Sequence, residues 1–164
     1  MHAVVVYESL WGNTADIARA IAEGIGPEAH AMPTDQATAE TLARADMIIA
    51  GAPLLGFNLP TEDILEAIRK NPGSPKSPDL AHPSMRAWLA NMPAGHAGCA
   101  AFETRIWWSP GSSAKKILAA LNAKGYQTAA KNAKFIVTGK YGPLRAGEID
   151  RAHEWGRSLA RATW

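Results

Sequence analysis

Apolar residues along the chain alternate between short unbroken runs and runs with helical spacing. The unbroken runs at 3–7, 47–51 and 98–102 are β-branched or small, which is typical of strands buried on both faces. Weaker strand candidates lie at 28–32 and 135–138. In the intervening segments apolar side chains recur every three or four positions and predict helices over 17–25, 37–44, 60–68, 85–92, 112–125 and 149–160.

Five strands interleaved with helices predict a parallel sheet that is covered on both faces. Ligands of such sheets bind beyond the carboxyl ends of the strands, so functional residues are expected in the loops that follow strands. The length of 164 residues suits one domain, 1–164. Segment 71–83 holds four prolines and is expected to be a loop insertion in that domain.

The loop after the first strand carries the strongest chemical signal. It contains Ser9, Gly12, Asn13 and Thr14 and runs directly into a helix. Glycine lets the backbone approach a ligand closely, and the N–H groups at a helix start bind phosphate. No Lys or Arg lies between positions 8 and 14, so neutral donors would hold the phosphate. An ordinary helix cap explains this loop equally well when it is considered alone.

The run from Val4 to Thr14 resembles the FMN-phosphate signature of flavodoxins, which is Ser/Thr-x-Ser/Thr-Gly-x-Thr after an apolar strand. Ser9, Gly12 and Thr14 match the signature. Trp11 stands where a hydroxyl is usual, and related flavodoxin-like domains carry an aromatic residue there.

The resemblance continues across nearly the whole chain. Segment 48–53 resembles the strand that leads to the first flavin-ring loop, and 135–148 resembles the last strand and the start of the final helix. It implies a flavodoxin-like, doubly wound α/β fold, with a five-stranded parallel sheet in the order 2-1-3-4-5 and helices on both faces.

The resemblance also implies one non-covalently bound FMN, enclosed by three loops. The residues it assigns to the phosphate are Ser9, Leu10, Trp11, Gly12, Asn13 and Thr14. Those assigned to the ring are Pro53, Leu54, Leu55, Gly56, Phe57 and Asn58 in a first loop, and Glu103, Thr104, Arg105, Ile106, Trp107 and Trp108 in a second. In the family a peptide of the first ring loop, usually at a glycine, reorients to accept a hydrogen bond from N5 of the reduced ring. Gly56 is the matching residue, and we expect it to tune the one-electron potentials.

Aromatic and basic side chains in these loops are candidates for the ring itself. Trp11, Phe57, Trp107 and Trp108 present large flat surfaces that could stack on a flavin. Arg105 could face the N1–O2 edge of the ring, and a solvated loop arginine is the alternative.

The implied function is an FMN-binding redox protein that carries electrons between a reductase and an acceptor protein. Two alternatives need the same fold: an FMN-dependent oxidoreductase acting on a quinone or similar small molecule, and an interaction domain that has lost FMN. The motifs G-x-S-x-G, H-E-x-x-H and C-x-x-C are absent and the five histidines have no ligand spacing, so neither a catalytic residue nor a metal is expected. A signalling receiver is disfavoured because the third strand ends without an aspartate, at Ala52.

Charge is distributed unevenly along the chain. Residues 1–82 hold 5 Lys/Arg against 11 Asp/Glu, and residues 83–164 hold 12 against 4, so a net charge of +2 conceals an acidic half and a basic half. The lysines of the basic half are spread over several elements without a nucleic-acid motif, so no nucleic-acid partner is expected. We expect a flavin rim less acidic than usual for the family, which favours an atypical partner or a small substrate.

The sequence shows neither a secretion signal at its start nor a run long enough to span a membrane. A cytoplasmic protein without a membrane partner is therefore expected, as a monomer or weak dimer.

Overall fold

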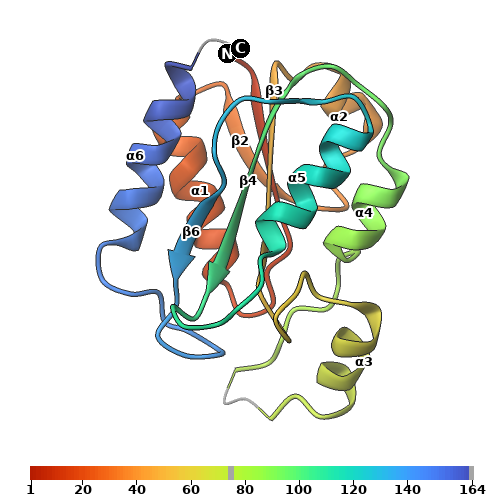
Figure 1. The fold of residues 1–164 in the computed structure, drawn as a ribbon, viewed down its shortest axis with the longest axis vertical. Helices are drawn as coiled ribbons and strands as arrows, with labels where there is room; N and C mark the ends of the chain where they lie inside the picture. Colours follow the sequence, from red (N-terminus) through yellow and green to blue (C-terminus); the bar gives the residue numbers. More distant parts are fainter. Residues whose placement is uncertain (74–75, 163–164) are drawn as a thin grey trace.

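The computed structural model describes residues 1–73 and 76–162. Ser74 and Pro75 of the Pro-rich segment, and the terminal Trp164, lie outside the described residues. A parallel sheet forms the centre of the molecule (Figure 1). Its strands are β1 (Ala3–Tyr7), β2 (Ala29–Pro33), β3 (Met47–Pro53), β4 (Gly98–Arg105), β5 (Gln127–Thr128) and β6 (Ala133–Ile136).

The strand order confirms the predicted topology. β1 lies between β2 and β3, with Ala3 opposite both Ala29 and Met47, and β4 pairs with the other edge of β3. The fifth position in the order is split, because the two-residue β5 and the longer β6 both pair with β4.

Helices cover both faces of the sheet (Figure 1). One face carries α1 (Asn13–Ile25) and α6 (Glu148–Ala160), and the other carries α2 (Ala39–Ala43), α4 (Met85–Asn91) and α5 (Ser113–Ala123). The exception is α3 (Glu62–Lys70), which lies with the Pro-rich segment beyond the carboxyl ends of the strands.

Alternation along the buried strands explains the two faces. In β1, Val5 packs toward the α1 and α6 side, whereas Val4 and Val6 pack toward α4 and α5. Successive strand side chains point to opposite faces, so a fully apolar strand supplies both cores at once. In the part of the chain that the structure describes, no helix has the length and apolar character needed to cross a membrane.

The structure corrects the expected ends of β3, β4 and β6 and adds the strand β5. β3 runs on to Pro53, which was expected in a loop. β4 continues three residues beyond Phe102 and takes in Glu103, Thr104 and Arg105, which were expected in a loop. The strand expected at 135–138 is β6, Ala133–Ile136, and β5 was not expected because both of its residues are polar and exposed. The charges of Glu103 and Arg105 indicated a loop, but in the fold these side chains pair with each other and with residues 111–113.

Candidate functional site

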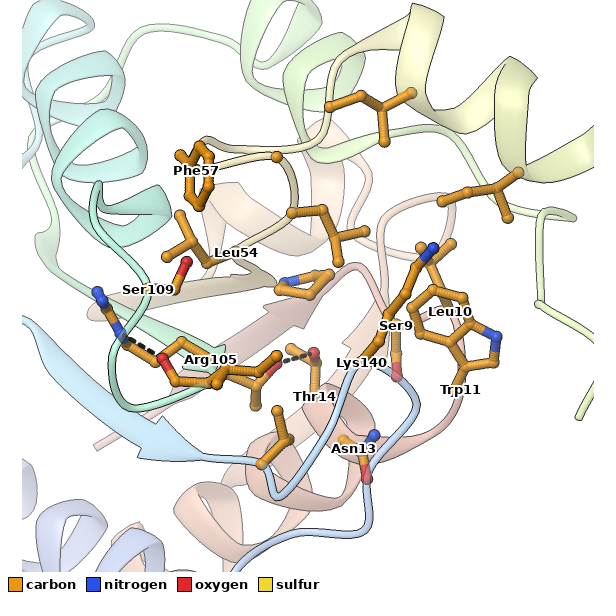
Figure 2. Close-up of a pocket in the computed structure, with 18 of the residues that line it drawn as sticks. Ser9, Leu10, Trp11, Asn13, Thr14, Leu54, Phe57, Arg105, Ser109 and Lys140 are labelled. Carbon is orange, nitrogen blue, oxygen red and sulfur yellow. Dashed lines mark hydrogen bonds between the residues drawn. The ribbon is translucent and has the colours of Figure 1, made fainter. Parts of the chain in front are cut away.

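A pocket of about 610 Å³ opens at the carboxyl edge of the sheet (Figure 2). It is bounded by the loops that follow β1, β3, β4 and β6, and by one side of α3. This is the edge at which ligands of open parallel α/β sheets bind.

Loop 9–14 folds as a turn that leads directly into α1. Gly12 has a φ of 94°, a left-handed conformation that side chains other than glycine's disfavour, and it directly precedes the first residue of the helix. The backbone N–H of Gly12 donates to Ser9 Oγ at 3.2 Å, and that of Asp16 donates to the Gly12 carbonyl at 3.0 Å. The earlier N–H groups of the first turn have no acceptor within the helix, so they can serve an anionic ligand.

Two side chains of α1 join this loop to other parts of the site. The hydroxyl of Thr14 lies 2.8 Å from the hydroxyl of Thr104 at the end of β4, and both side chains are buried. Asn13 Nδ2 donates to the carbonyl of Tyr141 at 3.2 Å, in the loop between β6 and α6. The start of α1 is therefore tied to the end of β4 and to the loop between β6 and α6.

Trp11, which stands where the phosphate signature usually has a hydroxyl, is part of a small apolar cluster. Trp11 is 5% exposed and packs with Leu10, Leu65 and Ile68. Its ring lies 4.9 Å from that of Tyr141 in an edge-to-face arrangement, and its Nε1 is buried without a hydrogen-bond partner. Trp11 thus fills the space between loop 9–14 and α3, where a hydroxyl would leave a void.

The first ring loop is a tight turn with two consecutive left-handed residues. Gly56 has a φ of 56° and Phe57 a φ of 63°, and the N–H groups of Leu55 and Asn58 each donate to the other's carbonyl, at 3.0 and 3.1 Å. Left-handed conformations are rare for residues other than Gly, Asn and Asp, so Phe57 is strained. In this conformation the Phe57 ring is 58% exposed and lies at the rim of the pocket.

The second ring loop is fixed by a buried ion pair rather than by exposed charges. Glu103 is fully buried, and its carboxylate accepts from Ser112 Oγ at 2.7 Å and from the N–H of Ser113 at 3.3 Å. Arg105 lies 3.7 Å from that carboxylate and donates to the Gly111 carbonyl at 2.9 Å. The guanidinium therefore holds the loop. Arg105 is 7% exposed, so the alternative of a solvated loop arginine is wrong, and its contact with the N1–O2 edge stays a prediction.

The two tryptophans of this loop are both exposed, but they lie differently. Trp108 is 61% exposed and lines the pocket, whereas Trp107 is 74% exposed and does not. Of the four aromatic candidates for a ring, the structure brings Trp11, Phe57 and Trp108 to the pocket.

An ionisable group lies directly before loop 9–14. Glu8 is 7% exposed and its Oε1 has no hydrogen-bond partner. The pKa of this carboxyl is raised from 4.5 to about 7, mainly by burial and also by the charge of Glu62. A hydrogen bond from the Met85 backbone and the charge of Arg86 act in the opposite direction. Glu8 lines a second cavity, of about 200 Å³, that shares Ser9 and Leu10 with the main pocket. Among the described residues no cluster of His, Cys, Asp and Glu suits a metal ion.

The fold has close counterparts among solved structures, although neither a protein-family model nor a curated protein matches the chain. Flavodoxin 2 from Bacillus cereus gives a TM-score of 0.68 at 18% identity, over 98% of this chain and 99% of that one. A flavodoxin from the domain Archaea gives 0.65 at 18% identity, over 98% and 97%. The chain has a flavodoxin-like fold.

A larger protein contains a similar unit. The flavodiiron core from Synechocystis gives a TM-score of 0.59 at 22% identity, over 97% of this chain but 35% of that one. The flavodoxin-like chain therefore spans about a third of that protein, and it matches the two flavodoxins over nearly their whole length.

Most of the residues predicted for the flavodoxin-like site meet at the one pocket. Those that line it are Ser9, Leu10, Trp11, Asn13, Thr14, Pro53, Leu54, Leu55, Gly56, Phe57, Thr104, Arg105, Ile106 and Trp108. Gly12, Asn58, Glu103 and Trp107 do not, and the first three shape the loops instead.

Sequence reasoning missed several lining residues. These are Ile64, Ala67, Ile68, Asn71, Ser109, Val137 and Lys140. The apolar spacing of α3 predicted a buried side, but its position beyond the sheet had no signal in the sequence.

The donor set of this pocket suits a phosphate ester joined to a flat aromatic ring. Loop 9–14 supplies hydroxyl and N–H donors at one end, and mainly apolar side chains line the rest. The volume of about 610 Å³ lies within the range of about 300–1,000 Å³ that is usual for cofactor pockets.

Proposed function

We propose that this chain binds FMN non-covalently and transfers electrons through it. The observation that carries the proposal is the convergence of three loops on one pocket: loop 9–14, with Gly12 left-handed ahead of α1, and the two largely apolar loops after β3 and β4. The flavodoxin-like fold and the resemblance of loop 9–14 to the FMN-phosphate signature support it. When bound, FMN supplies the electron chemistry, and the protein supplies binding, orientation and electrostatics.

Each part of the pocket has a role in this proposal. Ser9, Thr14 and the N–H groups at the start of α1 bind the phosphate. The turn around Gly56 and the loop carrying Trp108 enclose the ring, and Phe57 limits the access of water at the rim. The redox partners are a reductase and an acceptor protein.

The test is the absorption spectrum of the purified protein after FMN is added and the sample is desalted. Retained flavin absorption at one FMN per chain supports the proposal. A colourless protein contradicts it and favours a flavodoxin-like interaction domain that has lost FMN. Ser9→Ala combined with Thr14→Val should weaken FMN retention, and the distant surface change Lys116→Met should not.

A second candidate is an FMN-dependent oxidoreductase that acts on a quinone or similar small molecule. It is favoured by the apolar side of α3, where Ile64, Ala67 and Ile68 add lining to the same pocket. Turnover of a quinone by the FMN-loaded protein, with reductant in excess, would favour this enzyme. Well-separated one-electron potentials without such turnover would favour the electron carrier.

A further inference from the structure

Positive charge reaches loop 9–14 from two distant parts of the chain. The loop has no Lys or Arg of its own, and a flavin phosphate carries negative charge. The fold brings Lys76 from the Pro-rich segment, and Lys140 from the loop after β6, to this loop.

Lys76 holds a peptide of the loop in one orientation. Its Nζ donates to the Trp11 carbonyl at 2.7 Å, and lies 3.4 Å from where a Cβ on Gly12 would be. The N–H of the same peptide, that of Gly12, donates to Ser9 Oγ. Both ends of the peptide are therefore fixed. Because Ser9 Oγ accepts this bond, its own hydrogen can be donated to a ligand in the pocket.

The rest of the Pro-rich segment reinforces this contact. The N–H of Asp79 donates to the Leu10 carbonyl at 2.7 Å, and Leu80 packs against the cluster that contains Leu10 and Trp11. Among the described residues of segment 71–83, only Asn71 lines the pocket. The described part of the insertion therefore supports loop 9–14 from outside the pocket.

Lys140 approaches from within the pocket. It lines the pocket with Ser9, and in Figure 2 its side chain extends toward Leu10 and Trp11. Its Nζ lies 5.4 Å from the centre of the Tyr141 ring, and the Tyr141 carbonyl accepts the bond from Asn13. The loop that carries Lys140 is thus attached to the start of α1, where the phosphate would bind.

One carboxylate opposes this positive field in the first turn of α1. Asp16 is half exposed and its carboxylate is paired with Arg19 at 2.7 Å. This pairing offsets its repulsion of an anion at the helix start.

We propose that Lys140 contacts the phosphate of the bound flavin and that Lys76 is a positioning residue, so that together they select FMN over unphosphorylated riboflavin. The inference rests on the proposed FMN function. It assigns a role to the insertion and to part of the basic half of the chain.

The test compares FMN and riboflavin binding to wild type, Lys76→Met, Lys140→Met and the double variant, by flavin fluorescence titration at low and high salt. Each single change should weaken FMN binding about fivefold and leave riboflavin binding within about twofold, because only FMN carries the charge. The salt dependence of FMN binding should fall in both variants. Lys76→Arg should restore affinity, and Lys116→Met on the exposed side of α5 is the matched control. Urea denaturation of the flavin-free proteins checks that all variants are folded.

Equal effects of the lysine changes on FMN and riboflavin would overturn the inference while leaving the FMN function intact. If wild type binds neither flavin, the proposed function fails, and inorganic phosphate then tests the anion site alone. Phosphate should raise the melting temperature of wild type more than that of Lys140→Met. Equal shifts would overturn the anion site as well.

Discussion

The hydroxyl of Thr14, in the first turn of α1, lies 2.8 Å from the hydroxyl of Thr104, near the end of β4. These side chains are only 2% and 3% exposed. Their hydrogen bond joins the loop assigned to the phosphate with a loop assigned to the ring, so the two ends of the site are held together before any ligand binds.

Removing both hydroxyls of this pair should cost less stability than the two single removals added together. Thr14→Val or Thr104→Val alone leaves a buried hydroxyl without its partner, at a cost of about 1–3 kcal/mol. The double variant should lose less than the sum of the single losses, which urea denaturation of the flavin-free proteins would measure. Additive losses would show that the two hydroxyls do not interact.

The fold was predictable wherever burial depends on local pattern. β1 and β3 are unbroken apolar runs, and α5 begins after Ser112, whose hydroxyl accepts from Lys115 N–H at 3.2 Å. The end of β4 was not predictable in this way. Glu103 and Arg105 read as loop residues because their charges are matched only by each other and by groups that the fold brings to them.

The candidate site shows the same contrast between residues that a local sequence pattern indicates and residues that only the fold brings together. Loop 9–14 was found because its donors, its glycine and the helix start follow one another in the sequence. Lys76 and Lys140 were not assigned to the site, since they lie far from that loop along the chain and approach it only through tertiary structure. No spacing rule connects such residues.

Gly56 provides a test of the first ring loop. A Cβ at this position would lie 2.8 Å from Ile64 Cδ1, on a backbone with a φ of 56°. Gly56→Val should therefore lower the free energy of unfolding by about 1–2 kcal/mol, because β-branched residues disfavour this conformation. Both one-electron potentials of the FMN-loaded protein should shift, as spectroelectrochemical titration would show.

The matched control for this change is Gly147→Val, since Gly147 also has a positive φ, of 87°, and a Cβ there meets nothing within 4 Å. It should lower stability without moving the potentials. Unchanged potentials in Gly56→Val would show that this glycine does not tune the flavin.

Electron delivery by a basic partner protein should depend only weakly on salt. The pocket rim carries the exposed aromatic residues Phe57 and Trp108, and Lys140 lines the pocket. Long-range attraction between an acidic rim and a basic partner would be screened by salt, and this rim offers little of it. Stopped-flow reduction rates of the FMN-loaded protein at low and high ionic strength test this. A steep decline with salt would instead show an acidic docking surface.

Glu148 fixes the loop that carries Lys140. Removing the charge of its carboxylate should lower the stability of the protein at neutral pH more than at acid pH. Its carboxylate accepts from the Ile136 N–H at 2.7 Å, from Arg151 at 2.6 Å and from Arg145 at 2.9 Å. Burial raises its pKa, but these hydrogen bonds outweigh burial and lower it below the ordinary 4.5. The stability it provides is therefore present above that value and is lost as the pH falls below it.

Glu148→Gln should consequently cost about 1–3 kcal/mol at neutral pH, since charged hydrogen bonds are lost from a buried site. The difference from wild type should shrink in acid, as urea denaturation at a series of pH values would show. A difference that is constant with pH would mean that the carboxylate charge contributes nothing.

The raised pKa of Glu8 predicts the opposite dependence of stability on pH. Its pKa rises from 4.5 in the unfolded chain to about 7 in the fold, because burial penalises the charged carboxylate. The folded state therefore binds this proton more tightly than the unfolded state does between those values. Stability from this group is full below pH 4.5 and is lost as the pH rises through about 7, by up to about 3 kcal/mol.

Glu8→Gln keeps the size of the side chain and removes the titration, so its stability should not fall over this pH range as that of wild type does. Denaturation of both proteins across the range isolates Glu8, because the other titrating groups are common to the two. Relative to wild type, the variant should gain stability as the pH rises, whereas Glu148→Gln should lose it. Parallel curves for wild type and Glu8→Gln would show that the Glu8 carboxylate reaches water in the folded protein and keeps an ordinary pKa.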